Sequence, residues 1–436
     1  MRSDVAFIGG QNGDEGKGKC VYTVTDHAIG RYHLLDVPSS RILAVRYQGA
    51  HNAGHTVIID GVKYQLHHVT SSIITPEVYG LLGRGMYIEP RSLLEEIELL
   101  RSRGIKITPD NLGISSNAHV ILDYHTAEDQ GCYNLKEHTS TGRGIKQVAR
   151  DKYFRTGMRF IEFLDKGLMM KILEEKAFPA GVPPGLRSFG EFADSYDNQR
   201  RGLEGFLADD DDVFFDPRFV FAVEEGAQGA LIDIDVGQYP GITSSHPTNP
   251  PNRPKNIVVV YKFTVSSVGI GDRPFMTEMP DDLQDKVRQV WGEYGTSTGK
   301  PRHLGWFDCI AAEKTLRAIK GDYVAGTCLD RLEVFSELGV RPKVAVAYEL
   351  DNRVYTRWDI SFNKRGVLSQ VKPIYKEFDP WDRTVEADHK TLTPPARKYV
   401  DFIEQFLGHR FFMIGTGPED HQVIIDKSSM DKILNL

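Results

Sequence analysis

The chain has 436 residues, of which 40% are hydrophobic and 26% are charged, a composition ordinary for a globular protein. Its formal net charge of -7 at pH 7 argues against binding of nucleic acid through a basic surface, so no nucleic-acid partner is expected. No apolar run reaches the ~20 residues of a membrane helix, and the N-terminus leads straight into a predicted strand rather than a signal or transit peptide. The four cysteines lack CxxC spacing, so no zinc site or disulfide framework is predicted, and a cytoplasmic enzyme fits best.

A glycine-rich loop lies between the first predicted strand, residues 5–8, and a predicted helix with apolar residues at helical spacing over 21–28. Glycines stand at positions 9, 10, 13, 16 and 18. The order of strand, glycine loop and helix directs backbone N–H groups and the positive end of the helix dipole towards a phosphate. The loop therefore predicts a phosphate-binding site, and the alternative is an ordinary tight turn.

The loop differs from two well-known phosphate-binding patterns. A Walker A loop has glycine where this chain has Gln11, and Ser or Thr where this chain has Gly18. The hydroxyl that would hold Mg²⁺ is therefore missing, while a carboxylate, Asp14, lies inside the loop. The dinucleotide pattern also fails, because Val21 stands where its last glycine belongs.

Further strands and helices alternate along the chain. A helix that Ser92 caps and Gly104 ends has one apolar face, and residues 57–59 and 64–66 are predicted to form a hairpin. The other predicted strands are 41–47, 219–224, 257–261, 323–326, 344–347 and 411–414, and the other helices are 158–176, 311–319 and 397–406. This alternation predicts an α/β fold with a large, mostly parallel central sheet covered by helices.

Four consecutive aspartates, Asp209 to Asp212, raise the question of a metal site. A run of adjacent acidic residues is far more often a solvated loop, and we expect a loop here.

Polar clusters follow several of the predicted strands, where ligands bind in open α/β sheets. They are Asn52-Ala53-Gly54-His55-Thr56, Thr139-Ser140-Thr141-Gly142-Arg143-Gly144, Glu225-Gly226-Ala227-Gln228-Gly229 and Gly295-Thr296-Ser297-Thr298-Gly299-Lys300-Pro301-Arg302. Each cluster alone is also explained by turn chemistry. Their joint occurrence favours a binding site for phosphates, a base edge and a carboxylate.

These motifs resemble the adenylosuccinate synthetase family, from Gly10 to about Pro418. The opening signature of that family is kept except that Asn12 replaces tryptophan. The later motifs match in order, including Thr243-Ser244-Ser245, Gly305-Trp306-Phe307-Asp308, Leu329-Asp330 and Thr416-Gly417-Pro418. The resemblance implies a single catalytic domain over residues 1–436, with loop and helical insertions in a fold related to P-loop proteins.

The resemblance implies a ligase that joins L-aspartate to carbon 6 of a 6-oxopurine nucleotide, with GTP or ATP as phosphoryl donor. In this reading Asp14 is the general base that removes the N1 proton, and Asp14 and the Gly54 carbonyl hold Mg²⁺. His55 donates to the transferring phosphoryl group, and Gln228 stabilises the charge that develops on O6. Lys17 neutralises the phosphates.

The same resemblance implies the binding residues. The nucleoside triphosphate is assigned to Gly13, Asp14, Glu15, Gly16, Lys17, Gly18, Gly54, His55, Thr56, Arg302, Asp330, Gly415, Gly417 and Pro418. The substrate nucleotide is assigned to Asp14, Asn52, Thr141, Arg155, Gln228, Thr243 and Lys300, and L-aspartate to Gly295, Ser297, Thr298 and Lys300. Because the residue aligned with Arg155 comes from the neighbouring subunit in the family, a homodimer with composite sites is expected.

Three residues depart from the family pattern inside the implied site. Lys300 replaces an arginine and so loses its bidentate fork, Cys328 replaces a lysine that packs on the donor guanine, and Asn12 removes a large aromatic ring. Neutral divergence explains them with IMP as substrate, and a homologue that uses dGMP or GMP to make a 2-aminoadenine DNA precursor is the alternative. A nucleotide-binding regulator without catalysis is a further alternative, against which the retention of Asp14, His55 and Gln228 argues.

Overall fold

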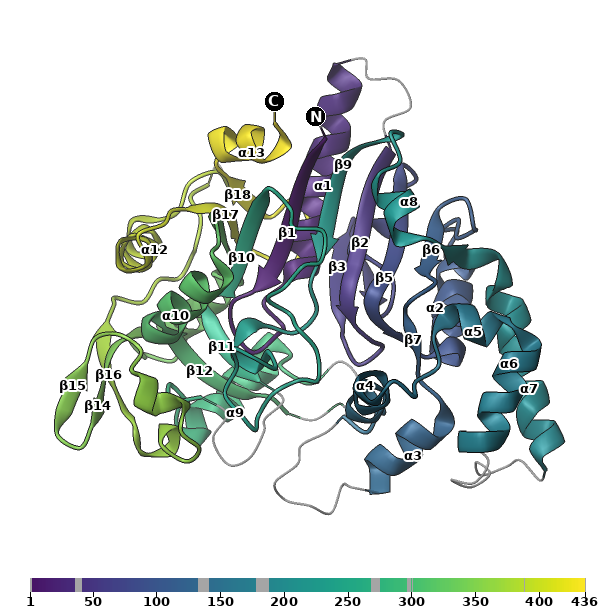
Figure 1. The fold of residues 1–436 in the computed structure, drawn as a ribbon. Coiled ribbons are helices and arrows are strands. Elements are labelled where there is room, and N and C mark those ends of the chain that lie inside the picture. Colours follow the sequence, from purple (N-terminus) through teal and green to yellow (C-terminus); the bar gives the residue numbers. More distant parts are fainter. Residues whose placement is uncertain are drawn as a thin grey trace. The chain divides into compact units, whose positions relative to one another are not determined.

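The computed structural model of the chain describes residues 2–35, 41–131, 141–177, 188–267, 275–295, 299, 301–387 and 389–435. Its backbone contacts divide the chain into two compact units, whose helices and strands are labelled in Figure 1. The first unit consists of Met1–Arg2, Thr25–Gly54 and Gln65–Ala227, and the second consists of Ser3–Val24, His55–Tyr64 and Gln228–Leu436. The single catalytic domain over residues 1–436 stays a prediction.

The first unit contains a parallel sheet in the order β9-β2-β5-β6-β8, with β7 paired to β5. Strands β2 and β9 are buried along nearly their whole length, as expected for parallel strands covered on both faces. Its elements are β2 (Arg41–Gly49), η1 (Ser71–Ile74), β5 (Val78–Ile88), α2 (Pro90–Ser102), β6 (Leu112–Ser115), β7 (His119–Val120), α3 (Asp123–Gly131), α4 (Ile145–Phe154), α5 (Phe160–Leu164), α6 (Lys166–Ile172), η3 (Leu173–Ala177), α7 (Phe189–Leu203), η4 (Glu204–Phe206), β8 (Leu207–Ala208), α8 (Asp210–Phe214) and β9 (Phe219–Glu225).

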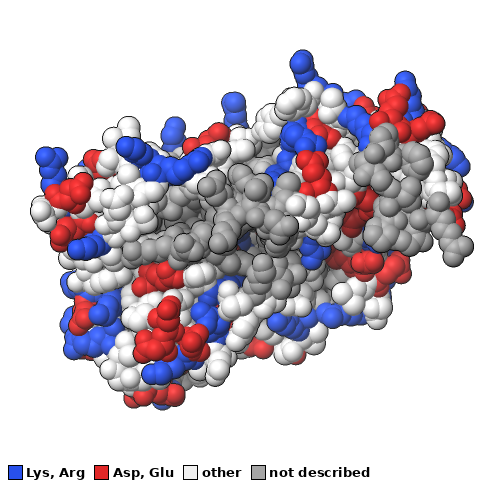
Figure 2. All heavy atoms as spheres, turned by 90° about the horizontal axis from the view of Figure 1, so that it is seen from below, with Lys and Arg blue, Asp and Glu red and all other residues white. Residues whose placement is uncertain are grey.

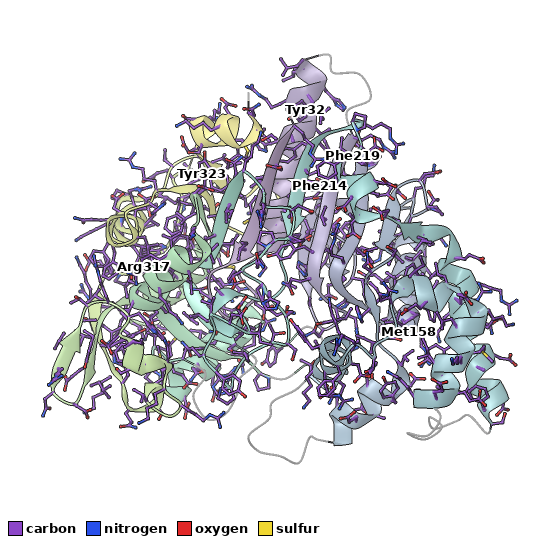
Figure 3. All side chains as sticks on the ribbon, in the orientation of Figure 1. Tyr32, Met158, Phe214, Phe219, Arg317 and Tyr323 are labelled. Carbon is purple, nitrogen blue, oxygen red and sulfur yellow. The ribbon has the colours of Figure 1, made fainter. Side chains whose placement is uncertain are left out.

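The apolar core of the first unit lies against this sheet. Phe214 and Phe219, labelled in Figure 3, pack with Leu43, Val45 and Leu81 in one buried cluster. Burial of each such side chain contributes ~1.5–3 kcal/mol to the free energy of unfolding. The sheet is therefore held by contacts between strands that are far apart in the sequence.

The second unit contains a mostly parallel sheet in the order β18-β17-β13-β10-β1, in which only the β17–β18 pair is antiparallel among the described strands. Its elements are β1 (Ser3–Gly9), β3 (His55–Ile59), η5 (Ala230–Ile232), β10 (Asn256–Lys262), β11 (Thr264–Ser267), α9 (Asp281–Trp291), β12 (His303–Asp308), α10 (Cys309–Ile319), β13 (Tyr323–Thr327), η6 (Asp330–Glu333), α11 (Val334–Glu337), β14 (Lys343–Leu350), β15 (Arg353–Tyr355), η7 (Ile360–Asn363), η8 (Leu368–Gln370), β16 (Lys372–Glu377), α12 (Pro394–Leu407), β17 (Phe411–Gly415), β18 (Val423–Ile425) and α13 (Lys427–Leu434). Helix α1 (Lys17–Leu34) and strand β4 (Val62–Leu66) each run from one unit into the other along the chain, and β3 pairs with β4.

The predicted strand 344–347 is confirmed as β14, and it belongs to a second sheet rather than to the mostly parallel one. Strand β14 pairs in parallel with β12 and antiparallel with β15 and β16. Periodicity identifies a buried strand but not its neighbours, so this separate sheet could not be predicted from the pattern of apolar residues.

Two predicted helices also differ from the structure. Helix α2 begins at Pro90, and the carboxylate of Glu89 rather than Ser92 accepts the free N–H groups of Arg91 and Ser92. Proline fits the first turn of a helix because it has no N–H to satisfy. The single helix expected over 158–176 is divided into α5, α6 and the π-helical η3, because Asp165 ends α5 and caps α6.

The surface in Figure 2 carries both signs of charge. Among the described residues on that face, Lys and Arg side chains are interspersed with Asp and Glu. In the part of the chain that the structure describes, no helix has the length and apolar character needed to cross a membrane.

Candidate functional site

The glycine loop of the second unit is shaped by its own glutamate. The fully buried carboxylate of Glu15 accepts hydrogen bonds from the backbone N–H groups of Gln11 (3.0 Å) and Gly13 (2.8 Å). The ammonium of Lys17 lies 2.6 Å from the same carboxylate and also donates to the backbone carbonyl of Gln228 (2.7 Å). Two amide donors of the loop are therefore used inside the loop, which fixes its shape around Asp14 and the start of α1. A contact of Glu15 with a triphosphate stays a prediction.

Two glycines allow this loop to pack closely. A Cβ atom on Gly10 would overlap the ring of Tyr261, and a Cβ on Gly229 would lie 2.5 Å from a carboxylate oxygen of Glu15. The side-chain amide of Gln11 donates to the carbonyl of Lys262 and accepts from its N–H, both at 3.0 Å. The loop is thus bound to the end of β10 by a pair of hydrogen bonds.

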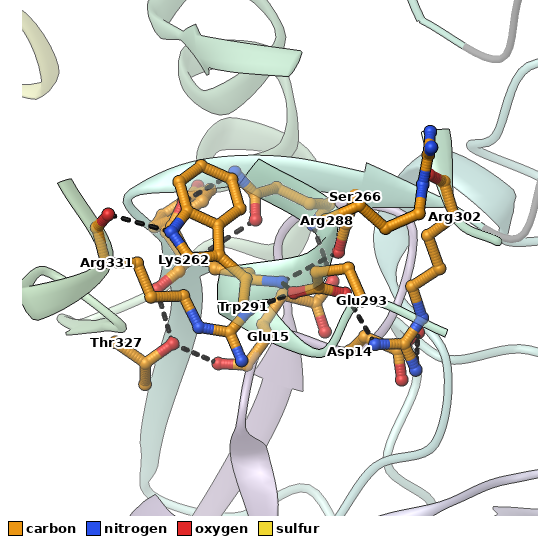
Figure 4. Close-up of polar contacts among 12 residues, drawn as sticks. Asp14, Glu15, Lys262, Ser266, Arg288, Trp291, Glu293, Arg302, Thr327 and Arg331 are labelled. Atoms are coloured by element: carbon orange, nitrogen blue, oxygen red, sulfur yellow. Dashed lines mark hydrogen bonds and ion pairs between the residues drawn. The ribbon is translucent and has the colours of Figure 1, made fainter. Parts of the chain in front are cut away.

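Asp14 belongs to a cluster of charged residues around Glu293 (Figure 4). Asp14 has a left-handed backbone conformation (φ 61°), and its carboxylate lies 3.0 Å from the guanidinium of Arg302. Arg302 also pairs with Glu293 at 2.6 Å, and Lys262 and Arg331 pair with the same carboxylate. This geometry brings together two residues predicted from the sequence, Asp14 and Arg302, with three that sequence reasoning missed.

The ionisation of this cluster follows from burial and charge. Burial raises the pKa of the Glu293 carboxyl, but the charges of Lys262, Arg331 and Arg302 outweigh burial and hold that pKa below its usual value. Burial lowers the pKa of Lys262 despite the neighbouring Glu293. Burial also opposes the charge on Arg302, yet Asp14 and Glu293 raise its pKa. Glu293 is therefore an anion that several cations share.

A second group of predicted residues lies around the loop after β17. The ammonium of Lys19 donates to the backbone carbonyls of Gly417 (2.7 Å) and Gln422 (3.0 Å), which joins the first turn of α1 to that loop. Asp420 donates its N–H to the carbonyl of Ile58 in β3. Hydrogen bonds thus connect the glycine-loop helix, strand β3 and the segment that runs from Gly415, the last residue of β17, through Gly417 and Pro418.

Asp330 follows β13 and begins η6. Among the described residues, its Oδ1 atom is buried without a hydrogen-bond partner. Burial raises the pKa of this carboxyl, and the positive charge of Arg331 opposes the shift. A buried acceptor without a partner is costly unless a ligand supplies a donor.

The first unit contains a polar pocket of about 420 Å³. It is lined by His51, Glu89, Arg91, Ser92, Leu122, Asp123, Thr126, Gln130, Thr141, Gly142 and Arg143. Thr141, predicted to contact the substrate phosphate, is thus among the residues that line this pocket. Burial lowers the pKa of His51 to about 2, so this ring is neutral near pH 7.

Arg155 is exposed at the C-terminus of α4, in a left-handed conformation (φ 62°). The two preceding residues are large and exposed as well, Tyr153 at 62% and Phe154 at 73%. Large apolar side chains that are exposed occur at surfaces that bind a partner.

The two units divide the predicted residues between them. Asn52, Gly54, Thr141 and Arg155 belong to the first unit, and Asp14, Lys17, His55, Thr56, Gln228, Thr243, Gly295, Arg302, Asp330 and the Gly415 to Pro418 loop belong to the second. Ser297, Thr298 and Lys300 lie outside the described residues. The roles given to these residues stay predictions.

Sequence reasoning missed Lys19, Lys262, Glu293 and Arg331. Glu293 and Arg302 lie on either side of the segment predicted to bind L-aspartate. Glu293 could have been found as a charged residue beside a segment rich in glycine and in side chains with hydroxyl groups. Lys262 lies at the end of an apolar strand, where a single charge was not distinguished from a surface residue.

The aspartate run 209–212 forms a capped helix rather than the expected solvated loop. Asp209 accepts from the N–H groups of Asp211 and Asp212, and the buried Asp210 accepts from the N–H of Arg84 (2.9 Å) and from Ser115. Acidic residues stabilise the first turn of a helix through its dipole.

Comparisons with known proteins give a consistent result. The family model for adenylosuccinate synthetase matches residues 6–424. Adenylosuccinate synthetase of Streptococcus sanguinis (strain SK36) is 34% identical over 451 residues, covering 98% of this chain and 99% of that protein. The enzyme of the same name from Pelotomaculum thermopropionicum is 34% identical over 450 residues, covering 97% and 99%.

Two solved structures are also similar. Fully ligated adenylosuccinate synthetase from Plasmodium falciparum matches with a TM-score of 0.83 and 26% identity, covering 97% of this chain and 99% of that chain. Cyanophage S-2L succinoaminodeoxyadenylate synthetase (PurZ), bound to dGMP and to dATP as an energy donor, matches with a TM-score of 0.56 and 17% identity, covering 100% and 99%. The second likeness concerns the fold alone. From the match over nearly its whole length, the chain belongs to the adenylosuccinate synthetase family of carbon–nitrogen ligases, nucleotide-binding enzymes of purine biosynthesis.

Proposed function

We propose that this chain joins L-aspartate to carbon 6 of IMP through a 6-phosphoryl intermediate, driven by hydrolysis of a nucleoside triphosphate to the diphosphate and phosphate. The observation that carries the proposal is Asp14, a carboxylate held by Arg302 inside the glycine loop before α1. A loop that only bound phosphate would gain nothing from a negative charge at this place.

In the proposed reaction Asp14 takes the proton from N1 of the 6-oxopurine, so that O6 becomes nucleophilic. O6 attacks the γ-phosphorus, the bond to the bridging oxygen breaks, and the nucleoside diphosphate leaves. The amine of L-aspartate then adds to carbon 6, and inorganic phosphate leaves with the former O6. A carbonyl oxygen is a poor leaving group, so its prior phosphorylation is what makes the substitution feasible.

The other residues with proposed catalytic roles, His55, Gln228 and Lys17, belong to the second unit, as Asp14 does. His55 is buried at the start of β3, where we propose that it donates to the transferring phosphoryl group. The side-chain oxygen of Gln228 is buried without a partner among the described residues, so this acceptor is available to an N–H group of a purine edge. The charge on O6 is proposed to be stabilised by the N–H₂ group of the same amide. Lys17, whose ammonium pairs with Glu15 in this structure, is proposed to neutralise the phosphates.

The residues present suit Mg²⁺. Asp14 offers a carboxylate and Gly54 a backbone carbonyl, and both are the hard oxygen ligands that Mg²⁺ prefers. Bound there with the triphosphate, the ion would neutralise charge on the phosphates.

The choice of IMP is supported by relatives that are 34% identical over nearly the whole length and are named adenylosuccinate synthetase. The alternative substrates dGMP and GMP are supported by the departures at Asn12, Cys328 and Lys300. The Nδ2 atom of Asn12 is buried without a partner in the described part of the chain, which leaves this amide available to a ligand.

For the phosphoryl donor we propose GTP, with ATP as the alternative. The unpartnered carboxylate oxygen of Asp330 suits a base edge with two adjacent N–H donors, which guanine presents and adenine does not. Cys328, in place of the lysine found in the family, opposes this preference by removing a side chain from the base.

We also propose a homodimer in which Arg155 completes the substrate site of the neighbouring subunit. The exposure of Arg155, together with that of Tyr153 and Phe154, supports a partner surface at the end of α4.

The proposed function is tested by phosphate release with L-aspartate and Mg²⁺, across IMP, dIMP, GMP and dGMP with GTP and ATP. Turnover chiefly of IMP is the expected result. Turnover chiefly of dGMP would replace IMP by the alternative and would identify Asn12, Cys328 and Lys300 as its signature. Binding of triphosphate without phosphate release from any pair would instead indicate a regulator.

A further inference from the structure

Glu293 forms ion pairs with three cationic side chains, and none of the roles proposed above accounts for these pairs. It follows the end of α9, its side chain is fully buried, and its carboxylate pairs with Lys262, Arg302 and Arg331 (Figure 4). Lys262 is also fixed by Ser266, at 2.9 Å. A buried carboxylate with three cationic partners is expensive to desolvate, so it needs a reason beyond stability.

The first direction from Glu293 leads to the proposed general base. One terminal nitrogen of Arg302 pairs with Glu293 at 2.6 Å, and the other pairs with Asp14 at 3.0 Å. A guanidinium is a rigid fork, so holding one of its nitrogens fixes the direction of the other. Glu293 therefore sets where Arg302 lies against Asp14.

The second direction leads to the stem of the segment proposed to bind L-aspartate. The N–H of Arg302 donates to the backbone carbonyl of Glu293 at 3.0 Å, and Tyr294 and Pro301 form the next bridge. The same two residues that pair through their side chains thus also close the base of this segment.

The third connection from Glu293 leads to Asp330, which is proposed to bind the base of the donor triphosphate. Arg331 pairs with Glu293 and directly follows Asp330 in η6. The indole N–H of Trp291 donates to the carbonyl of Arg331 at 2.9 Å, which fixes the backbone there as well. The orientation of Asp330 is therefore tied to Glu293 through its neighbour.

We propose that Glu293 is a positioning residue. Its buried carboxylate fixes the orientation of Asp14, the proposed general base, and of Asp330, which is proposed to bind the base of the donor triphosphate. It acts through Arg302 on Asp14 and through Arg331 on Asp330, and it touches no substrate. The inference rests on the roles proposed above for Asp14 and Asp330. The charge count supports it, because three cations face Glu293 and Asp14, and the surplus positive charge suits the polyanionic substrates.

The test is the Glu293→Gln variant, which keeps the shape of the side chain and removes its charge. We expect kcat to fall by about 100-fold, because an oriented guanidinium loses its anchor. We also expect the dissociation constant of the donor triphosphate, measured by calorimetry with Mg²⁺ and without the other substrates, to rise about 10-fold. The matched control is Glu404→Gln, which makes the same change in a buried glutamate that pairs with Arg397 in α12.

A double-mutant cycle separates positioning from general destabilisation. Arg331→Gln alone should weaken donor binding, and its addition to Glu293→Gln should cost less than it costs in the wild-type background, because both changes break one connection. Fully additive losses would overturn the donor direction of the proposal. Values of kcat and of the dissociation constant within two-fold of wild type, or losses equal to those of Glu404→Gln, would overturn the proposal as a whole.

A second variant covers the case in which Glu293→Gln does not fold. Glu293→Gln with Lys262→Met removes one anion and one cation, so the net charge of the cluster is unchanged. This double variant should fold and still lose activity and donor affinity, and wild-type behaviour would contradict the proposal. If the wild-type chain binds triphosphate but turns over no purine nucleotide, the proposed function fails, while the binding measurement still tests the connection from Glu293 to Arg331.

Discussion

At the scale of single residues, Asp14 offers the sharpest test of the proposed chemistry. Replacing Asp14 by Asn keeps the size and the left-handed backbone that Asp and Asn both tolerate, but it removes the base. We expect aspartate-dependent phosphate release to fall by roughly 10²- to 10⁴-fold, with a smaller loss of triphosphate affinity in calorimetry, because Asp14 is also proposed to hold Mg²⁺.

Asp60→Asn is the control for the Asp14 variant. Asp60 also has a left-handed backbone (φ 50°), and it is exposed at the turn between β3 and β4. Its replacement should leave phosphate release unchanged. Activity of Asp14→Asn within a few-fold of wild type would exclude Asp14 as the base.

Gly10 tests the close packing that forms the glycine loop. A Cβ atom at this position would overlap the Tyr261 ring, whose hydroxyl is fixed by the carbonyl of Ala312 at 2.8 Å. Gly10→Ala should therefore lower the free energy of unfolding by ~1–3 kcal/mol in urea titrations. Gly30→Ala, in α1 with no atom within 4 Å of the new methyl group, should instead raise it by up to ~1 kcal/mol. A neutral effect of Gly10→Ala would show that the ring moves away freely.

At the scale of helices and strands, the N-cap of α10 makes a prediction about pH. Asp308 is buried, its carboxylate accepts from the N–H groups of Ile310 and Ala311, and Tyr348 donates to it at 2.5 Å. Burial raises the pKa of Asp308 from 3.8 to about 6, although these hydrogen bonds oppose the shift. The folded chain therefore holds a proton that the unfolded chain has lost between about pH 4 and pH 6.

Because of that proton, the stabilisation from Asp308 is complete below pH 4 and is lost as the pH rises through 6. Relative to Asp308→Asn, the wild type should lose up to ~3 kcal/mol of unfolding free energy between pH 4 and pH 7. Asp426, the N-cap of α13, is the control because hydrogen bonds from Ser429 lower its pKa. Its difference from Asp426→Asn should change in the opposite direction. A pH-independent difference at Asp308 would contradict the raised pKa.

The sequence predicted elements better than it predicted their partners. The strands expected at 5–8, 219–224 and 257–261 are confirmed as β1, β9 and β10, because continuous apolar runs need burial on both faces. The strand at 344–347 is confirmed but lies in another sheet, since pairing depends on chain segments that periodicity does not connect. The N-cap of α2 was predicted wrongly because the carboxylate of Glu89 accepts the N–H groups that a Ser hydroxyl accepts in most helices.

In the candidate site as well, individual residues were predicted from the sequence, but their partners in space were not. Asp14 and Arg302 were named from motifs, and the structure brings them within 3.0 Å of each other. Glu293 and Lys262 were not named, because a buried charge is identified by its partners and those partners lie about 10 to 40 positions away along the chain. Motifs record the residues that meet a ligand, whereas the residues that hold them in place become visible only in three dimensions.

At the scale of the whole molecule, the proposed dimer predicts that negative charge introduced at the end of α4 separates the two subunits and abolishes activity. Tyr153 and Phe154 are exposed beside Arg155, and a charge placed there would have to be buried in the interface. Tyr153→Asp with Phe154→Asp should therefore yield a monomer in sedimentation equilibrium, with the proposed sites inactive. Tyr239→Asp, which changes a 62% exposed tyrosine in the second unit, is the control and should leave the mass unchanged.

Composite sites make a stronger prediction, which two inactive variants test together. Asp14→Asn destroys the base of its own subunit, and Arg155→Ala removes the arginine that we propose serves the neighbour. In an equal mixture about half of the dimers are mixed, and in each of them one site has both an intact base and an intact arginine. Phosphate release should then recover to roughly one quarter of wild type, although either variant alone is inactive. If Arg155 instead served its own subunit, each mixed dimer would carry one defect in every site, and mixing would restore nothing.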